Sequence, residues 1–156
     1  MDRLAELVGM LAWMSFVVTG AYLTRIDMRE HRLPNIIVLS AGGGGVLSIA
    51  LYSALTQSWG AFGRAVLAAV INMAIFLSIS VLGGMGMGDV KYAAVTGLYL
   101  GWLGWEYLWW GSFLAFAAAG ALAVVHILRR RTRTAIAFGP FMFGGVIAGS
   151  LLSAAA

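Results

Sequence analysis

Cysteine is absent from this sequence of 156 residues, and histidine occurs only at His31 and His126. A chain without thiols forms no disulfide framework, has no thiol nucleophile and offers no cysteine ligands to zinc. The two histidines lie far apart in the sequence, which argues against a histidine-based metal site. We therefore expect a protein that uses no metal and no other cofactor.

Charged residues are also scarce. Ten residues are basic and six are acidic, which is 10% of the chain, whereas 62% of the residues are hydrophobic. Soluble domains carry about 25% charged residues, and a soluble fold of this size exposes too much surface to hide so many apolar side chains. The composition therefore predicts a membrane protein and excludes a soluble enzyme domain, a nucleic-acid-binding protein and a disordered regulator.

Long apolar runs predict transmembrane helices, each of which needs about 20 residues. The stretch 90–128 is too long for one helix, and we divide it near Gly101, Gly104 and Glu106, where glycines and an acid predict a hairpin. The other spans are expected at 4–23, 36–55, 65–82 and 135–156. The sequence thus predicts an all-α integral membrane protein, with residues 1–156 forming a single domain built as a bundle of six transmembrane helices.

The basic residues predict the orientation of this bundle. The loops after the first, third and fifth spans share one membrane face, and they hold eight of the ten basic residues: Arg25, Arg29, Arg32, Lys91, Arg129, Arg130, Arg131 and Arg133. By the positive-inside rule this face is cytoplasmic, and both termini are extracytoplasmic. Five of the six tryptophans belong to the opposite face, as is typical of a membrane interface.

Glycines interrupt two of the expected spans. The run 42–45 is four consecutive glycines, and Gly97 and Gly101 form a GxxxG pair. Small residues let helix backbones approach one another in membranes, so we favour close helix packing for both groups. For the run of four, a kink or hinge is the alternative.

Two acidic residues, Asp27 and Asp89, lie at matching depth on the expected cytoplasmic side. Asp27 follows the first span, and Asp89 opens the fourth after a glycine-rich turn at 83–88. Acidic residues at the membrane usually mark function. The glycine turn has two interpretations: an extended peptide lies against its backbone, or it is an ordinary loop. It is not a phosphate loop, because no Lys-Ser/Thr pair follows at the required spacing.

Three motifs resemble those of the type IV prepilin peptidases, which are polytopic membrane aspartic proteases. Residues 86–91, Gly-Met-Gly-Asp-Val-Lys, match the family's GxGDxK motif. Residues 26–35 resemble its first aspartate motif, an Asp followed by basic residues and Pro-Asn, and Phe138-Gly139-Pro140 resembles its Phe-Gly-Pro signature. Ala137 stands where many members have proline. The resemblance covers nearly the whole chain in the right order.

The resemblance implies an aspartic endopeptidase with Asp27 and Asp89 as its catalytic pair. It implies cleavage of the leader peptide of a type IV prepilin at the cytoplasmic face of the inner membrane. The partners are then the prepilin and membrane lipid, with no nucleic acid. Long family members have a cysteine-containing methyltransferase domain between the first two spans. This chain has a short loop there and no cysteine, so it resembles the cleavage-only form associated with Flp/Tad-type pili.

Two carboxyl groups brought close together share a proton, because both cannot ionise easily. One then acts as general base on water while the other donates a proton to the scissile carbonyl. The two roles stay unassigned, because a coupled pair titrates as a unit.

Five further residues are expected to bind the substrate or shape the site: Gly86, Gly88, Lys91, Pro34 and Asn35. The two glycines would hold an unwound scissile segment. Lys91 either anchors the chain at the membrane surface, positions Asp89, or reads an acid on the substrate. Pro34 begins the second span, where its missing N–H costs nothing, and Asn35 caps that helix or bonds to the loop.

Two other function classes stay open at this point. One is a small carrier or proton-conducting protein with Asp27 and Asp89 on an ion path, and the other is a non-catalytic scaffold of a pilus assembly. A carrier would favour charges near mid-bilayer and repeated halves, and the sequence has neither. The oligomeric state is not predicted.

Overall fold

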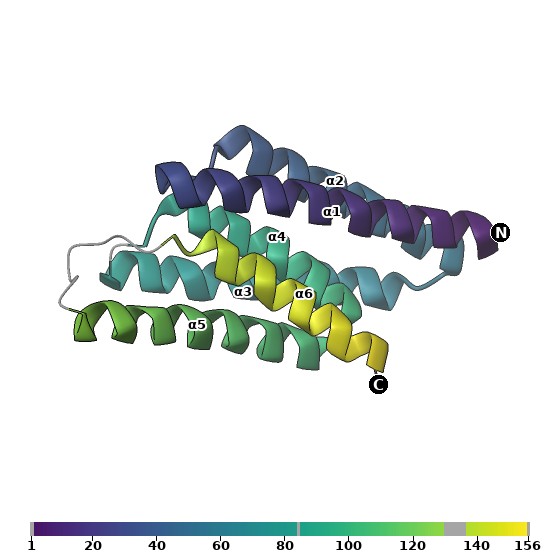
Figure 1. The fold of residues 1–156 in the computed structure, drawn as a ribbon. Coiled ribbons are helices and arrows are strands. Elements are labelled where there is room, and N and C mark those ends of the chain that lie inside the picture. The colour runs from purple at the N-terminus through teal and green to yellow at the C-terminus, as the bar shows by residue number, and fades with distance from the viewer. Residues whose placement is uncertain (1, 84, 130–136, 156) are drawn as a thin grey trace.

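The computed structural model describes residues 2–83, 85–129 and 137–155, which form six α-helices and no β-strand (Figure 1). The helices are α1 (Asp2–Glu30), α2 (Asn35–Thr56), α3 (Trp59–Gly83), α4 (Met87–Leu103), α5 (Trp105–Leu128) and α6 (Gly139–Ala155). The all-α bundle of six helices predicted from the sequence is therefore confirmed. Arg130, Arg131, Arg133 and the start of the expected sixth span lie outside the described residues.

Four helices, α1, α2, α3 and α5, are long and apolar enough to cross a membrane. The other two, α4 and α6, have 17 residues each. Gly104 separates α4 from α5, close to the expected hairpin. The helices run alternately up and down, so both ends of the described chain lie at one end of the bundle (Figure 1). The parity of the predicted spans is thus correct, whereas the assignment of one end to the cytoplasm stays a prediction.

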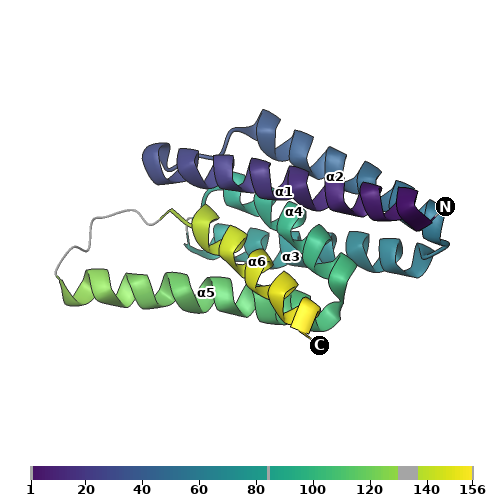
Figure 2. The same cartoon turned by 45° about the vertical axis from the view of Figure 1, so that its right-hand side comes forward.

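Helix α4 is the buried centre of the bundle. It contacts α2, α3, α5 and α6, and ten of its seventeen residues are buried. In both overall views α1 and α2 lie to one side of α4, and α3 and α5 to the other (Figures 1 and 2). A helix enclosed by others needs no lipid-facing stripe, which is why α4 tolerates polar residues such as Thr96 in its interior.

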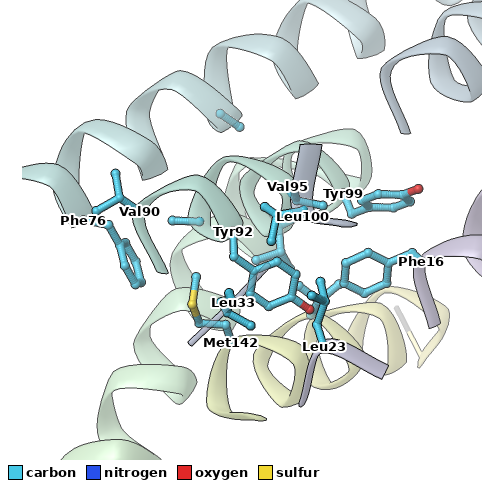
Figure 3. Packing of buried hydrophobic residues seen from close by; sticks show 14 of the residues in the cluster. Phe16, Leu23, Leu33, Phe76, Val90, Tyr92, Val95, Tyr99, Leu100 and Met142 are labelled. Atoms are coloured by element: carbon cyan, nitrogen blue, oxygen red, sulfur yellow. The ribbon is translucent and has the colours of Figure 1, made fainter. Parts of the chain in front are cut away.

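Aromatic rings join α1 to α4. The ring centroids of Phe16 and Tyr99 lie 4.4 Å apart, and the Tyr99 hydroxyl donates a hydrogen bond of 3.1 Å to the carbonyl oxygen of Ala12. Figure 3 shows Phe16, Tyr92, Tyr99 and Leu23 gathered in this core. All six helices contribute residues to the same buried cluster.

The GxxxG pair packs α4 against α3, as predicted. A Cβ atom on Gly97 would lie 2.8 Å from the carbonyl oxygen of Ala68, and one on Gly101 would overlap the Cβ atom of Ala68 and lie 3.2 Å from the Cα atom of Ala65. Arg64 reinforces the contact, because its guanidinium donates to the carbonyl oxygens of Gly101 and Trp102 at 2.8 and 3.0 Å. Only glycine lets the two backbones come this near.

The run 42–45 differs from the prediction at two of its four positions. Gly45 packs against Tyr99 and Leu98, and Gly42 approaches Val95. A Cβ atom on Gly43 or Gly44 would meet nothing within 4 Å. Close packing within the chain therefore explains Gly42 and Gly45 and not the other two.

The substitution Gly97→Ala is expected to destabilise the bundle by about 1–3 kcal/mol, because the added methyl group overpacks the contact with the backbone of α3. The matched control is Gly120→Ala on α5, where the added atom meets open space and a helix gains about 0.5–1 kcal/mol from losing a glycine. Thermal unfolding in detergent measures both changes. Equal melting temperatures for the two variants would contradict the close α3–α4 contact.

Candidate active site

Asp27 is buried near the end of α1, with 4% of its surface exposed. Its Oδ2 atom accepts a hydrogen bond of 2.7 Å from the backbone N–H of Gly139, the first residue of α6. The first N–H groups of a helix have no partner within the helix and favour negative charge. A Cβ atom on Gly139 would lie 2.8 Å from the same oxygen, so glycine is required there for α6 to approach the carboxyl group.

The connection after Asp27 turns the chain back in four residues. The N–H of His31 donates to the carbonyl oxygen of Asp27 at 2.9 Å, and His31 then adopts the left-handed conformation, with φ of 51°, that ends α1. Pro34 stands directly before α2, and its carbonyl oxygen accepts hydrogen bonds from Ile37 and Val38. The expected start of the second span at Pro34 is thus correct to within one residue.

Asp89 lies in the first turn of α4, three residues after Gly86, which precedes the helix. Its carboxyl group accepts a hydrogen bond from the backbone of Gly86, while its own N–H donates to the Gly86 carbonyl oxygen at 3.0 Å. This reciprocal pairing resembles a capping box and holds the side chain at the helix start. Gly86 itself has φ of −66°, which any residue can adopt.

Gly88 brings this turn against the α1–α2 connection. A Cβ atom on Gly88 would lie 3.0 Å from the Cβ of Leu33, which is tighter than ordinary packing allows. The missing side chain lets the start of α4 lie beside the end of α1. The two aspartates, distant in sequence, are brought to the same place by this contact.

Asp27 and Asp89 line one cavity of about 280 Å³ at the end of the bundle opposite the chain ends. The two carboxyl groups are close enough to interact electrostatically. Six of the seven site residues expected from the sequence line this cavity: Asp27, Asn35, Gly86, Gly88, Asp89 and Lys91. Pro34 does not line the cavity, and its contribution is to the start of α2, where its carbonyl oxygen accepts hydrogen bonds from Ile37 and Val38.

Lys91 bonds across to α2. Its Nζ atom donates a hydrogen bond of 2.8 Å to the Oδ1 atom of Asn35. This contact answers the question left open for Asn35, which bonds to Lys91 rather than capping its helix. His31 and Arg32 also line the cavity.

Sequence reasoning missed the part that Gly139 plays. The Phe-Gly-Pro match pointed to this segment, and a glycine beside a proline at a helix start was the available signal. What the match lacked was the partner of the Gly139 N–H, which is 112 positions away. Among the described residues, no three His, Asp or Glu side chains gather as a metal centre would require.

The chain matches the model of the type IV leader peptidase family over residues 14–128. Among curated proteins, the prepilin leader peptidase/N-methyltransferase of Escherichia coli (strain K12) is 31% identical over 133 residues, which cover 81% of this chain and 55% of that protein. The protein of the same name from Burkholderia pseudomallei (strain 1026b) is 29% identical over 135 residues, 79% of this chain and 40% of that protein. The chain thus spans about half the length of these relatives, or less. No solved structure gives a significant match.

The shared cavity predicts that Asp27→Cys and Asp89→Cys, combined in one chain, are joined by a short bifunctional maleimide. The native chain contains no cysteine, so no background thiol competes, and mass spectrometry of the linked peptides reports the reaction. Asp27→Cys with Glu106→Cys is the control, because Glu106 begins α5 at the other end of the bundle. If both thiols of the first pair react with a monofunctional maleimide and yet never become linked, the placement of Asp27 and Asp89 in one cavity is wrong.

Proposed function

The chain belongs to the type IV leader peptidase family, and on this premise we propose that it is an aspartic endopeptidase that cleaves the leader peptides of type IV prepilins. The observation that carries the proposal is the common cavity of Asp27 and Asp89. Both aspartates fall within the matched residues 14–128, whereas the Phe-Gly-Pro motif lies beyond them. The family match also confirms the resemblance carried by the sequence motifs.

Cleavage in this proposal uses the two carboxyl groups as a pair that shares one proton. The ionised carboxylate takes a proton from a water molecule, whose oxygen attacks the carbonyl carbon of the scissile amide. The protonated carboxyl donates to the carbonyl oxygen. As the tetrahedral intermediate collapses, the first carboxyl passes the proton taken from water to the leaving nitrogen, and the second regains a proton from a hydroxyl group of the intermediate. Backbone donors from Gly139 and Gly86 orient the two carboxyl groups for this exchange.

The substrate has to expose its scissile amide to the cavity, because a helical peptide hides its amides within its own hydrogen bonds. The start of α4 supports an unwound segment there, since Gly86 and Gly88 line the cavity and place no side chain in it. Arg32, His31 and Lys91 surround the cavity with basic groups. Because Lys and Arg residues gather on the cytoplasmic side of membrane proteins, these groups support a site at the cytoplasmic face of the inner membrane.

We assign cleavage and not methylation to these residues. The relatives are named for both activities, and family members of that kind would have a methyltransferase domain between the first two spans. Only residues 31–34 separate α1 from α2, which leaves no room for a domain at that point. A pilin of the Flp/Tad type is the proposed substrate.

Asp27→Asn and Asp89→Asn are each expected to lower the cleavage rate by at least about 10²-fold, because general acid–base catalysis contributes about 10²–10⁴. The amide has the shape of the carboxyl group and cannot exchange the proton. Purified protein is incubated with a prepilin in detergent, and N-terminal sequencing of the product reports cleavage.

Glu30→Gln is the control for this pair. Glu30 is exposed three residues after Asp27 and does not line the cavity, so its variant is expected to cleave at the native rate. Native activity in either aspartate variant would refute the catalytic pair.

Gly139→Ala is expected to lower kcat by about 10²-fold, because the added methyl group displaces the Asp27 carboxyl group, and a displacement of about 1 Å has an effect of that size. Gly144→Ala on the same helix is the matched control, since its added atom meets nothing within 4 Å. The same cleavage assay measures both. Equal rates for the two variants would show that the hydrogen bond from Gly139 does not position Asp27.

A further inference from the structure

A groove of about 200 Å³ follows α4 between α2 and α3. One face of α2 and one face of α4 form most of its lining, and α3 contributes Ala69. Gly42, Gly43 and Ala94 leave room in it, because they place no large side chain there. Gly43, which packs against nothing in the chain, is thus explained by its place in the groove lining.

The groove exists because α2 and α3 meet at one end only. They are joined by a short connection at the end near the chain termini, where Ile49, Ala65 and Leu98 pack together. Both overall views show the two helices separating toward the opposite end (Figures 1 and 2). Helix α4 forms the floor between them, since it packs along α3 and also contacts α2.

The groove adjoins the candidate active site. Lys91 lines both the groove and the cavity that contains Asp27 and Asp89. Asn35, bonded to Lys91, lines the cavity, and Leu39 lines the groove one turn further along α2. The lining of α4 then extends from Lys91 for about two turns to Leu98. An occupant lying along this lining points its end at the two carboxyl groups.

The apolar lining of the groove favours a helical occupant. Apart from Lys91 its lining is apolar, and a peptide placed there finds no partners for its backbone. In lipid such a segment has to satisfy its own N–H and C=O groups, which a helix does. Small residues such as Gly43, Ala69 and Ala94 let the backbone of that helix come close.

We propose that this groove binds the hydrophobic helix of the prepilin substrate, with the leader end of that helix at Lys91. The inference rests on the proposed function and adds where the substrate lies on the enzyme. The helix reaches the groove sideways from lipid, between α2 and α3, and the segment beyond it unwinds into the cavity.

The experiment compares Gly43→Leu with Gly44→Leu. A Cβ atom at either position meets nothing within 4 Å, so we expect both variants to fold, which thermal unfolding in detergent checks. Of the two positions, only Gly43 lines the groove. Each variant is given the full prepilin and, separately, a soluble peptide that contains the leader and scissile bond without the hydrophobic helix. We expect Gly43→Leu to cleave the full prepilin at least tenfold more slowly and the soluble peptide at the native rate. Gly44→Leu is expected to match the native protein on both substrates.

Two outcomes would overturn the proposal. If Gly43→Leu and Gly44→Leu cleave the full prepilin equally fast, the groove holds something else, such as a lipid chain. If Gly43→Leu slows both substrates equally, the substitution disturbs the catalytic site and not the binding of a helix.

Binding is tested without cleavage in the Asp89→Asn background. Gly43→Cys is expected to cross-link to a cysteine introduced into the prepilin helix, and exposed Gly120→Cys on α5 is not. No cross-link at Gly43 would overturn the groove proposal. A cross-link at Gly43 together with no cleavage by the native protein would overturn the proposed function and leave the groove proposal standing.

Discussion

The hydrogen bond from the Gly139 N–H to Asp27 is the interaction on which the site depends. A buried carboxyl group without donors is costly, and here the start of α6 supplies a donor together with the favourable field of a helix N-terminus. The same bond joins the first and last helices of the bundle. Chemistry and fold are therefore coupled at this point, because the carboxyl group that we propose to serve the reaction also binds the first residue of α6.

Glycine supports this arrangement at three contacts of one kind. Gly139 admits the Asp27 carboxyl group, Gly88 admits Leu33, and Gly97 admits the backbone of α3. In each case a missing Cβ atom removes the separation that a side chain imposes. Two of these contacts, at Gly88 and Gly97, hold α4 against its neighbours, and this positions Asp89 in the first turn of the helix. A rigid central helix suits a site whose two halves come from distant parts of the chain.

The helices were predictable because each depends on a local property, the length of an apolar run. The division at Gly104 followed from the same argument, since an uncharged stretch too long for one span has to turn. The meeting of Asp27 with Asp89 could be expected from the motifs. Its physical means, the contact of Gly88 with Leu33, depends on tertiary packing that no local pattern encodes.

Two interpretations from the sequence were incomplete for the same reason. The run 42–45 was expected to serve close packing, and two of its glycines, Gly43 and Gly44, face open space. Gly43 does so in the groove where α2 and α3 diverge. Lys91 had three interpretations, and none of them named Asn35 as its partner. In both cases the missing knowledge was which helices are neighbours at that depth.

The bond between Lys91 and Asn35 has a consequence for motion. It ties α2 to α4 at the boundary between groove and cavity, on side chains that are partly open to solvent. A hydrogen bond to a charged group contributes about 1.5–3 kcal/mol, and exposure lowers that figure. Breaking this bond is therefore expected to cost less than separating the aromatic rings that join α1 to α4. We therefore expect α2 and α4 to separate more easily at the end with the candidate site than near the chain termini, where Ile49, Ala65 and Leu98 pack together.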